Sequence, residues 1–432
     1  MNRRFFIKFL LSLGFGAYFP QLAEASRLEK LYQPQDGFKP LTAVKFLRQM
    51  VTKNPATSRM IMWQTNKEIK NVRLEYFLDG ENFSNFGDVG YKYFNRDDEE
   101  DFIYFCELKN LSPASLYKFR IISDDKATAW QNLKTVGENF KMLVFSDSQC
   151  ANYKTWQKVA DTANDNFPDA ELVTVIGDLV DNGQANYQWR AWKNAAALLV
   201  SEKIFAPVIG NHECYNLKWK NSLPTIYLEN FKVPSNGEEN FEGYFYSFNF
   251  GVANFFVLNN NFFELDEFKP DMQKVQNEWL KNAVKNSDRR WKIVLMHKDF
   301  FDYPNDKFED FAENFMNLFD ELKIDLVLSG HVHTYRNRGK IFAKKKSARG
   351  TTYILCGRAG DQKYIEKIFE FDEVTAPNIQ TEGESFITLD ATEKNLSLTC
   401  YSVDGEIWDK IILTSPLSEK NHSNDDNTDN DK

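Results

Sequence analysis

The sequence predicts an α/β domain preceded by an all-β sandwich domain, and a change of pattern along the chain supports this division. From about residue 42 to residue 136, short strands alternate with turn residues. From residue 137 to about residue 415, apolar strand segments alternate with amphipathic helices and end in a further run of strands. Such strand–helix alternation is typical of a layered α/β domain with largely parallel strand pairing.

The composition is that of an ordinary soluble protein. The chain has 432 residues, of which 42% are hydrophobic and 27% are charged, and this length suffices for two or three domains. The net charge of −9 disfavours nucleic acid as the primary partner, because binding to a phosphate backbone needs a cationic surface.

The N-terminus has the features of an export signal. A basic start with Arg3 and Arg4 is followed by a short apolar run, residues 9–19, and by Ala23-Glu24-Ala25. This order is typical of a secretory signal peptide, here residues 1–25, and the paired arginines resemble a twin-arginine signal. We therefore expect a periplasmic, cell-surface or secreted protein, with an uncleaved N-terminal anchor as the alternative. The run is too short for a permanent transmembrane helix.

Two further segments are expected to lack a packed core. Residues 26–41 contain Pro and Gly and are expected to form a linker. Residues 416–432 consist mostly of Asn, Asp, Ser and Lys, and are expected to form a disordered tail.

Within the all-β domain, residues 42–136, the clearest signal is the segment 111–120. Leu111 and Pro113 form a turn that is followed by Tyr117 and an alternating strand, a pattern typical of a tyrosine corner. Further strands are expected at residues 58–63, 72–76 and 130–135. Together these features resemble a fibronectin type III-like module, whose expected role is structural support.

The α/β domain, residues 137–415, is expected to begin with a strand over residues 142–146. Further strands are expected at residues 172–176, 207–209, 255–258, 293–296 and 326–328. Helices are expected at residues 152–163, 187–199, 271–286 and 307–322. The final strands, at residues 352–356, 386–390, 396–402 and 408–413, are expected to complete a second sheet of the same domain.

Candidate ligands follow the ends of these predicted strands. The chain has five histidines, and four of them lie just past a strand end beside two carboxylates and an amide. The residues concerned are Asp147, Asp178, Asn211, His212, His297, His331 and His333. Because ligands bind at the carboxyl edge of the strands in an open α/β sheet, we expect these side chains to converge.

The residue types indicate metal chemistry. Carboxylates, an amide and imidazoles form a set of oxygen and nitrogen ligands that suits Fe, Mn or Zn. We expect two metal ions per chain, with Asp178 shared, since two neighbouring cations can clamp a phosphoester and activate water. The five cysteines fit no zinc pattern, and buried unpaired thiols are expected. A Cys150–Cys214 disulfide and direct metal ligation are the alternatives.

At this point the motifs resemble a known family. In order and spacing, the motifs resemble those of the calcineurin-like metallophosphoesterase superfamily, and the preceding β module makes the architecture similar to that of purple acid phosphatases. The motifs are Asp147-x-Gln149, Gly177-Asp178-Leu179-Val180-Asp181, Gly210-Asn211-His212-Glu213, His297 and Gly330-His331-x-His333. The resemblance implies a four-layer α/β/β/α domain.

The resemblance also implies individual roles. Asp147 and His333 are expected to hold the first metal. Asn211, His297 and His331 are expected to hold the second, with Asp178 shared between the two ions. His212 is implied as the general acid for the leaving oxygen or as a donor to the phosphate. The carboxylate of Asp181 is implied as the group that orients His212.

The chain departs from these relatives at two ligand positions. Asp181 stands where purple acid phosphatases place a tyrosine ligand, and Gln149 stands where many relatives place a histidine. We therefore predict a colourless enzyme whose first metal is comparatively labile. Gln149 is expected to bind metal through its amide oxygen, to hydrogen-bond a metal-bound water, or to line the pocket.

Substrate recognition is the least specific part of the pattern. Relatives often place an arginine at the position of Asn337. Arg336, Arg338 and Arg358 are candidates for gripping the substrate anion, although an arginine in such a position is more often a surface charge.

The sequence thus predicts an exported binuclear-metal phosphatase that hydrolyses phosphomonoesters by attack of a metal-bound hydroxide. A phosphodiesterase with the same metal centre is the first alternative. A cell-surface binding protein with an inert site is the second.

Overall fold

A computed structural model of the chain describes residue 34 and residues 36–96, 99–302, 307–308, 310–363 and 383–415. The predicted export signal, the tail 416–432 and most of the predicted linker lie outside these residues. In the described residues, no helix is both long and apolar enough to span a membrane.

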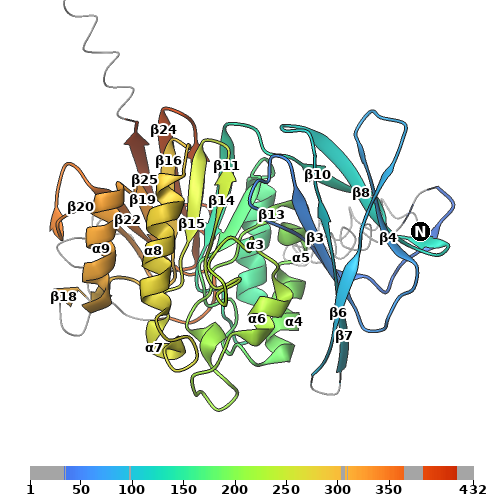
Figure 1. Cartoon of the computed structure of the whole chain (residues 1–432), viewed down its shortest axis with the longest axis horizontal. Coiled ribbons are helices and arrows are strands. Elements are labelled where there is room, and N and C mark those ends of the chain that lie inside the picture. Colours follow the sequence, from blue (N-terminus) through green and yellow to red (C-terminus); the bar gives the residue numbers. More distant parts are fainter. Residues whose placement is uncertain are drawn as a thin grey trace, which may run out of the picture.

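The N-terminal part is an all-β sandwich, as predicted, and lies at one end of the molecule (Figure 1). One sheet contains β1 (Lys39–Pro40), β4 (Val72–Leu78), β5 (Asn85–Gly87), β8 (Leu116–Ser123), β9 (Lys126–Ala127) and β10 (Gln131–Lys134). The facing strands are β2 (Lys45–Met50), β3 (Arg59–Thr65), β6 (Gly90–Arg96) and β7 (Glu99–Leu108). Trp63 of β3 and Phe119 of β8 are fully buried in the core between them.

The turn before β8 has the predicted geometry. The hydroxyl oxygen of Tyr117 accepts a hydrogen bond from the backbone N–H of Ser112 at 2.8 Å, which ties the strand to its preceding turn. At the other edge of this sheet, Lys39 and Pro40 form β1 and pair with β9. The end of the predicted linker is therefore part of the sandwich.

The facing sheet of the sandwich continues into the α/β domain. In the described residues it is a ten-stranded sheet with the order β25-β24-β23-β11-β12-β13-β2-β3-β7-β6. The junction is the short parallel pair of β2 with β13 (Ile204–Phe205), in which Gln49 lies opposite Ile204. The Gln49 side-chain amide donates hydrogen bonds to the carbonyl oxygens of Asn132 and Ser201, at 2.9 and 2.8 Å, which seals the junction.

The α/β domain has the predicted layers, with a second sheet stacked on the first. The remaining strands of the first sheet are β11 (Phe140–Phe145), β12 (Leu172–Val175), β23 (Ser385–Ala391), β24 (Asn395–Ser402) and β25 (Ile407–Thr414). The second sheet, seven-stranded in the described residues, has the order β14 (Tyr246–Phe250), β15 (Ala253–Val257), β16 (Trp291–Leu295), β19 (Leu326–Ser329), β22 (Thr351–Cys356), β20 (Tyr335–Phe342) and β21 (Lys345–Lys346). A separate two-stranded sheet pairs β17 (Phe301–Asp302) with β18 (Lys307–Phe308).

The core of this domain has two parts, and alternate side chains of β11 point into one or the other. Met142 and Val144 of β11 pack with Ile293 of β16 between the two sheets, whereas Leu143 and Phe145 point to the helices. On the first sheet the helices are α3 (Lys154–Asn166), α4 (Asn186–Ala195) and α5 (Ala197–Glu202), and on the second α8 (Met272–Lys285) and α9 (Asp310–Leu322). Short helices η1 (His212–Cys214), α6 (Thr225–Asn230) and α7 (Phe262–Leu265) lie in the connections.

Three predicted elements differ in detail. The strand expected at residues 207–209 is reduced to a bridge between Ile176 and Val208, since Pro207 has no N–H to donate. The helix expected at residues 187–199 is divided at Ala196 into α4 and α5. The final strands are shared between the sheets, because β22 joins the second sheet while β23, β24 and β25 extend the first.

Candidate metal centre

The predicted ligands come from strand ends of both sheets and meet in one place. Asp147 follows β11, Asp178 follows β12, His297 follows β16, and His331 and His333 follow β19. The strands β11 and β12 are parallel in one sheet, and β16 and β19 are parallel in the other. Their carboxyl ends therefore deliver ligands to a common edge.

The first group of ligands consists of Asp147, Asp178 and His333, whose donor atoms lie within 4.8 Å of one another. The Nε2 atom of His333 is 3.3 Å from Oδ1 of Asp147, and its Nδ1 is 2.9 Å from the Gln362 carbonyl oxygen. Because a carbonyl oxygen only accepts, Nδ1 carries the proton and Nε2 presents its lone pair to the carboxylates.

Gln149 lies beside this first group. Its side-chain nitrogen Nε2 is 3.5 Å from both Oδ2 of Asp178 and Nε2 of His333. Its Oε1 is buried and has no hydrogen-bond partner in the described structure. A buried amide oxygen without a partner is costly unless a further group binds it, and an amide oxygen is a normal ligand for a hard cation.

The second group consists of Asp178, His297 and His331. The Nε2 atom of His297 is 3.1 Å from Oδ2 of Asp178 and 3.0 Å from Oδ1 of Asn211. Its Nδ1 is 2.8 Å from the Ile176 carbonyl oxygen, so the lone pair of Nε2 faces the carboxylate oxygen. His331 is partly exposed, and its ring lies 5.2 Å from that of His297.

These donors form two groups that have one residue in common. In each group, lone pairs of imidazole nitrogens and carboxylate oxygens point toward one another, which is unfavourable unless a cation or a proton lies between them. Asp178 belongs to both groups, and the backbone N–H of His212 donates to its Oδ1 at 2.9 Å. The described donors therefore suit metal ions, and Asp178 is positioned to contact both sites.

The protonation equilibria reflect this crowding. Burial raises the pKa of Asp178, but the imidazoles of His297, His212 and His331 outweigh burial and hold the pKa well below its usual range. Burial lowers the pKa of His297, while Asp178 and Asp147 raise it to about 9. For His331, burial and the neighbouring His297 together hold the pKa well below its ordinary value.

His212 lies at the edge of the centre. Its Nε2 is 3.9 Å from Oδ2 of Asp178, and its Nδ1 donates to the backbone carbonyl oxygen of Asp181 at 2.7 Å. Burial lowers the pKa of His212, but Asp178 and the Asp181 carbonyl outweigh burial and raise it above the usual value. The protonated form of the His212 imidazole is thus favoured, and its Nε2 lies on the side of Asp178.

The group that orients His212 differs from the expectation. The Asp181 carboxylate is 3.8 Å from Nδ1 and accepts a hydrogen bond from Nε2 of Gln362 at 2.6 Å. The backbone carbonyl of the same residue makes the orienting contact instead. A main-chain oxygen fixes the ring more rigidly than a mobile carboxylate, and any residue at position 181 provides one.

Comparisons with known proteins agree with this geometry. The calcineurin-like phosphoesterase family model matches residues 140–335, and the purple acid phosphatase N-terminal domain model matches residues 46–135. The chain carries a calcineurin-like phosphoesterase domain behind a purple acid phosphatase N-terminal domain.

Individual relatives cover the chain in part. Probable purple acid phosphatase 20 of Arabidopsis thaliana is 24% identical over 202 residues, which are 45% of this chain and 46% of that protein. Purple acid phosphatase 23 of the same plant is 25% identical over 223 residues, 48% of this chain and 43% of that protein. The chain spans about half the length of these curated relatives.

A solved structure shows the same fold over most of the chain. The structure of purple acid phosphatase PPD1 from yellow lupin (Lupinus luteus) seeds has a TM-score of 0.71 and 19% sequence identity. The match covers 86% of this chain and 74% of the lupin chain.

The phosphoesterase domain holds its ligands on strained backbone. Asp147, Asp178, His331 and His333 have positive φ angles of 50°, 51°, 74° and 62°. Each such conformation costs about 1–3 kcal/mol in a residue other than glycine, and the surrounding structure must compensate for it. The strain turns each side chain back from its strand end toward the shared edge.

Two glycines make room for the ligands. A Cβ atom on Gly330 would overlap Oγ of Ser146 and crowd the Asp147 carboxylate. A Cβ atom on Gly210 would overlap the backbone N and the carboxylate of Asp178. The two loops can therefore approach each other only with glycine at these positions.

Glu213 is the residue whose importance the sequence analysis missed. Its buried carboxylate accepts hydrogen bonds from the backbone N–H groups of Asp178, Leu179, Val180 and Gly210, at 2.9, 2.8, 3.3 and 2.7 Å. Burial and the nearby Asp178 raise its pKa to about 7. The signal for this residue is its place as the fourth residue of Gly210-Asn211-His212-Glu213, although its backbone partners leave no pattern in the sequence.

The three candidate arginines lie in buried structural contacts. Nη1 of Arg338 is 2.5 Å from Oδ1 of Asp299, and Nη2 of Arg358 is 3.2 Å from Oε1 of Glu384. Nη1 of Arg336 donates to the carbonyl oxygen of Tyr335. All three side chains are buried, which contradicts the expectation of surface charges, whereas contact with the substrate stays a prediction.

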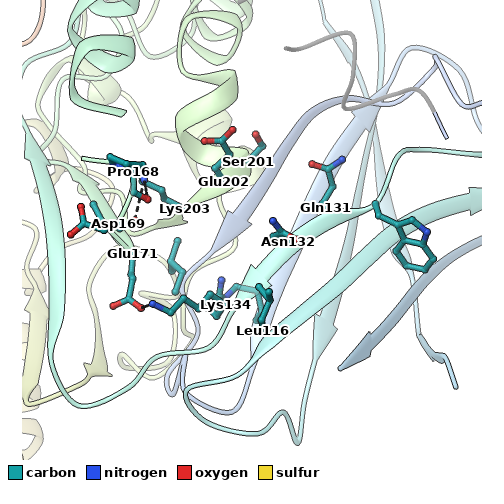
Figure 2. Close-up of a pocket in the computed structure, with 14 residues that line it drawn as sticks. Leu116, Gln131, Asn132, Lys134, Pro168, Asp169, Glu171, Ser201, Glu202 and Lys203 are labelled. Carbon is teal, nitrogen blue, oxygen red and sulfur yellow. Dashed lines mark hydrogen bonds and ion pairs between the residues drawn. The ribbon is translucent and has the colours of Figure 1, made fainter. Parts of the chain in front are cut away.

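One cavity near the sandwich lies apart from the two ligand groups. It measures about 390 Å³ and lies between β10 and the loops around Glu171 and Lys203 (Figure 2). Lys134 and Glu171 form an ion pair there at 2.7 Å, and Lys203 donates to the carbonyl oxygen of Ala170 at 3.0 Å. The cationic groups are thus engaged in holding the junction together.

The five cysteines are buried and unpaired, as expected. Burial raises the pKa of Cys150 to about 11 and that of Cys214 well above its ordinary value, which leaves both thiols in their neutral form.

Replacement of Glu213 by glutamine tests its role as the anchor of both loops. The amide nitrogen of a glutamine cannot accept a hydrogen bond, so some of the four buried backbone N–H groups would lose their acceptor. We expect the free energy of unfolding to fall by about 2–4 kcal/mol, measured by urea denaturation. The control Glu242→Gln, on an exposed side chain, is expected to change it by less than about 0.5 kcal/mol. Equal stability of the two variants would contradict the anchoring role.

Proposed function

We propose that this protein hydrolyses phosphomonoesters at a centre of two metal ions that share Asp178. The observation that carries the proposal is the pair of ligand groups with Asp178 in common, beside a histidine whose pKa is raised. The family of the domain and its fold support the same reaction class.

Each residue of the centre has a separate task. Asp147 and His333 would hold the first ion, and Gln149 would add an oxygen donor if its amide turned Oε1 toward that ion. Asn211, His297 and His331 would hold the second. Two such ions neutralise the phosphate and supply a nucleophile near neutral pH. The oxygen and nitrogen donors suit Fe, Mn or Zn.

His212 protonates the leaving group in this proposal. The Asp181 carbonyl binds Nδ1–H, so Nε2 is the atom that faces the centre and can carry the transferable proton. Asp178 raises the pKa of the imidazole and favours the protonated form that a general acid requires. When the ester bond breaks, the proton passes from Nε2 to the departing oxygen, and the neutral imidazole recovers a proton from solvent.

The reaction class can be tested directly with metal-loaded protein. We expect release of 4-nitrophenol from 4-nitrophenyl phosphate, with slower turnover of bis(4-nitrophenyl) phosphate. Turnover of the diester alone would replace the phosphomonoesterase proposal by a phosphodiesterase. Turnover of neither ester by a fully metal-loaded protein would refute both.

Elemental analysis of variants tests the two-metal centre. The wild-type chain is expected to bind two ions, and His331→Ala and His333→Ala are each expected to retain one, because the two histidines belong to different ligand groups. The holo-protein is also expected to lack a strong visible charge-transfer band, since Asp181 stands where purple acid phosphatases carry a tyrosinate. Loss of both ions in both variants, or a purple holo-protein, would contradict this arrangement.

His212→Gln tests the general acid. We expect kcat to fall by about 10²–10⁴-fold, and to fall further for phenyl phosphate than for 4-nitrophenyl phosphate, because the poorer leaving group depends more on protonation. Asp181→Asn keeps the orienting backbone carbonyl, so its effect on kcat is expected to be under about tenfold. A uniform loss with both esters would show that His212 binds the phosphate without delivering the proton.

We also propose that the protein is exported by a twin-arginine route, on the basis of Arg3, Arg4, the apolar run and Ala23-Glu24-Ala25. The exported protein is expected to begin at Ser26, as determined by N-terminal sequencing. Replacing Arg3 and Arg4 together by lysine is expected to retain the precursor in the cytoplasm. The same exchange at Arg27, beyond the cleavage site, is expected to have no effect. A wild-type chain that remains uncleaved in the cytoplasm would contradict the proposal.

A further inference from the structure

A short hairpin, residues 215–221, places an exposed tryptophan beside the proposed general acid. Tyr215 and Asn221 form the bridge that closes the hairpin, and Trp219 lies near its tip. The Trp219 ring is 5.9 Å from the His212 ring at an interplanar angle of 86°. Tyr215 is 5.8 Å from His212 and 6.1 Å from Trp219, so the three rings form one cluster.

The hairpin is held in a fixed position relative to His212. The side-chain oxygen of Asn216 accepts hydrogen bonds from the backbone N–H groups of Lys218 and Lys220, at 2.8 and 3.2 Å. The Asn216 carbonyl accepts from the N–H of Trp219 and from Nδ2 of Asn182, each at 2.8 Å. Asn182 directly follows Asp181, whose carbonyl orients His212. The hairpin and the general acid are therefore anchored to the same loop.

Folding alone does not account for a tryptophan at this position. Trp219 adopts a φ angle of +58°, a conformation that is unfavourable for a bulky side chain. Its side chain remains 56% exposed, so burial of the ring offsets little of the free-energy cost of this conformation. Strained residues of this kind gather at ligand-binding sites, where the surrounding structure holds them in place.

The position of His212 determines which part of the substrate comes close to Trp219. In the proposed reaction, Nε2 of His212 must reach the oxygen of the departing group. A group bonded to that oxygen would extend past His212, and the exposed Trp219 ring lies 5.9 Å from the His212 ring. Lys218 and Lys220, both exposed on the same hairpin, add positive charge that favours the approach of an anionic ester.

We propose that Trp219 is a specificity-determining residue whose ring binds an aromatic ring carried by the leaving group, so that aryl phosphomonoesters and nucleoside monophosphates are preferred over alkyl phosphomonoesters that carry no ring. This inference rests on the proposed phosphomonoesterase reaction with His212 as the acid. Stacking of an aromatic ring on the face of a tryptophan is favourable and does not require one particular ring, as in the binding of unpaired nucleobases.

Hydrolysis by the metal-loaded full-length protein gives the first test. The ratio of kcat/KM for phenyl phosphate to that for glycerol 2-phosphate is expected to fall about tenfold in Trp219→Ala. Trp219→Phe is expected to keep most of the preference. Leu217→Ala, which removes an exposed apolar side chain from the same hairpin, is expected to leave the ratio unchanged. The ratio of kcat/KM for adenosine 5′-monophosphate to that for glycerol 2-phosphate is also expected to fall in Trp219→Ala, and an unchanged ratio would exclude nucleotides from the proposed preference.

Binding of inert analogues gives a second test that does not require turnover. Calorimetry with phenylphosphonate and methylphosphonate is expected to show that Trp219→Ala reduces the preference for the aryl compound about tenfold. If the wild-type protein hydrolyses no ester but the preference in binding is still lost, the proposed function fails while the role of Trp219 stands. If Trp219→Ala, with an unchanged melting temperature, alters neither ratio, the role of Trp219 is refuted whatever the activity.

Discussion

The candidate centre depends on one buried carboxylate that does not face a metal. Glu213 accepts four backbone hydrogen bonds from the two loops that follow β12 and the Val208 bridge, and so fixes Asp178 against Gly210. Without a common acceptor, these N–H groups would be buried and unsatisfied at the point where two strands end. The shared position of Asp178 in both ligand groups is a consequence of this anchor, since a small shift of its loop would detach it from one of them. The same anchor sets the distance between Asp178 and His212, because both loops move with Glu213.

The strained backbone of four ligands is possible because the sheets on either side are rigid. Asp147 and Asp178 stand at the ends of two paired strands of the ten-stranded sheet, and His331 and His333 follow a strand in the interior of the seven-stranded sheet. Further hydrogen bonds connect the loops of the two sheets, such as that from the backbone N–H of His331 to the Asp147 carboxylate at 3.0 Å. The free-energy cost of the positive φ angles is thus compensated by the surrounding strands, whose pairing in the sheets prevents each ligand from relaxing on its own. The outcome is a set of ligands that is organised before any ion arrives, which lowers the entropy cost of binding.

Local patterns in the sequence predicted much of this structure, and their limits are physical. Strand ends followed by Asp, Asn or His led to the ligands, and the turn with Pro113 and Tyr117 led to the corner of the sandwich. The pairing of β2 with β13 left no such signal, because it joins residues far apart in the sequence through only two residues per strand. The carbonyl of Asp181 could not be predicted either, since a backbone group is the same in every residue. The burial of the three candidate arginines could not be predicted, because sequence does not distinguish a buried guanidinium from one on the surface.

The continuous sheet also explains how the N-terminal sandwich contributes to the centre without supplying a ligand. In α4, the buried amine of Lys193 donates to Oε1 of Gln64 in β3 at 2.6 Å. The preceding residue, Trp192, donates from Nε1 to Oγ of Ser148 at 2.9 Å. The Ser148 hydroxyl in turn donates to the Leu179 carbonyl at 3.3 Å, between the loops that carry Asp147 and Asp178. Burial and the neighbouring Arg48 hold the pKa of Lys193 well below its usual value, although Asp101 opposes them. A polar side chain is retained at this cost because it connects the sandwich to the helix that supports both metal-binding loops.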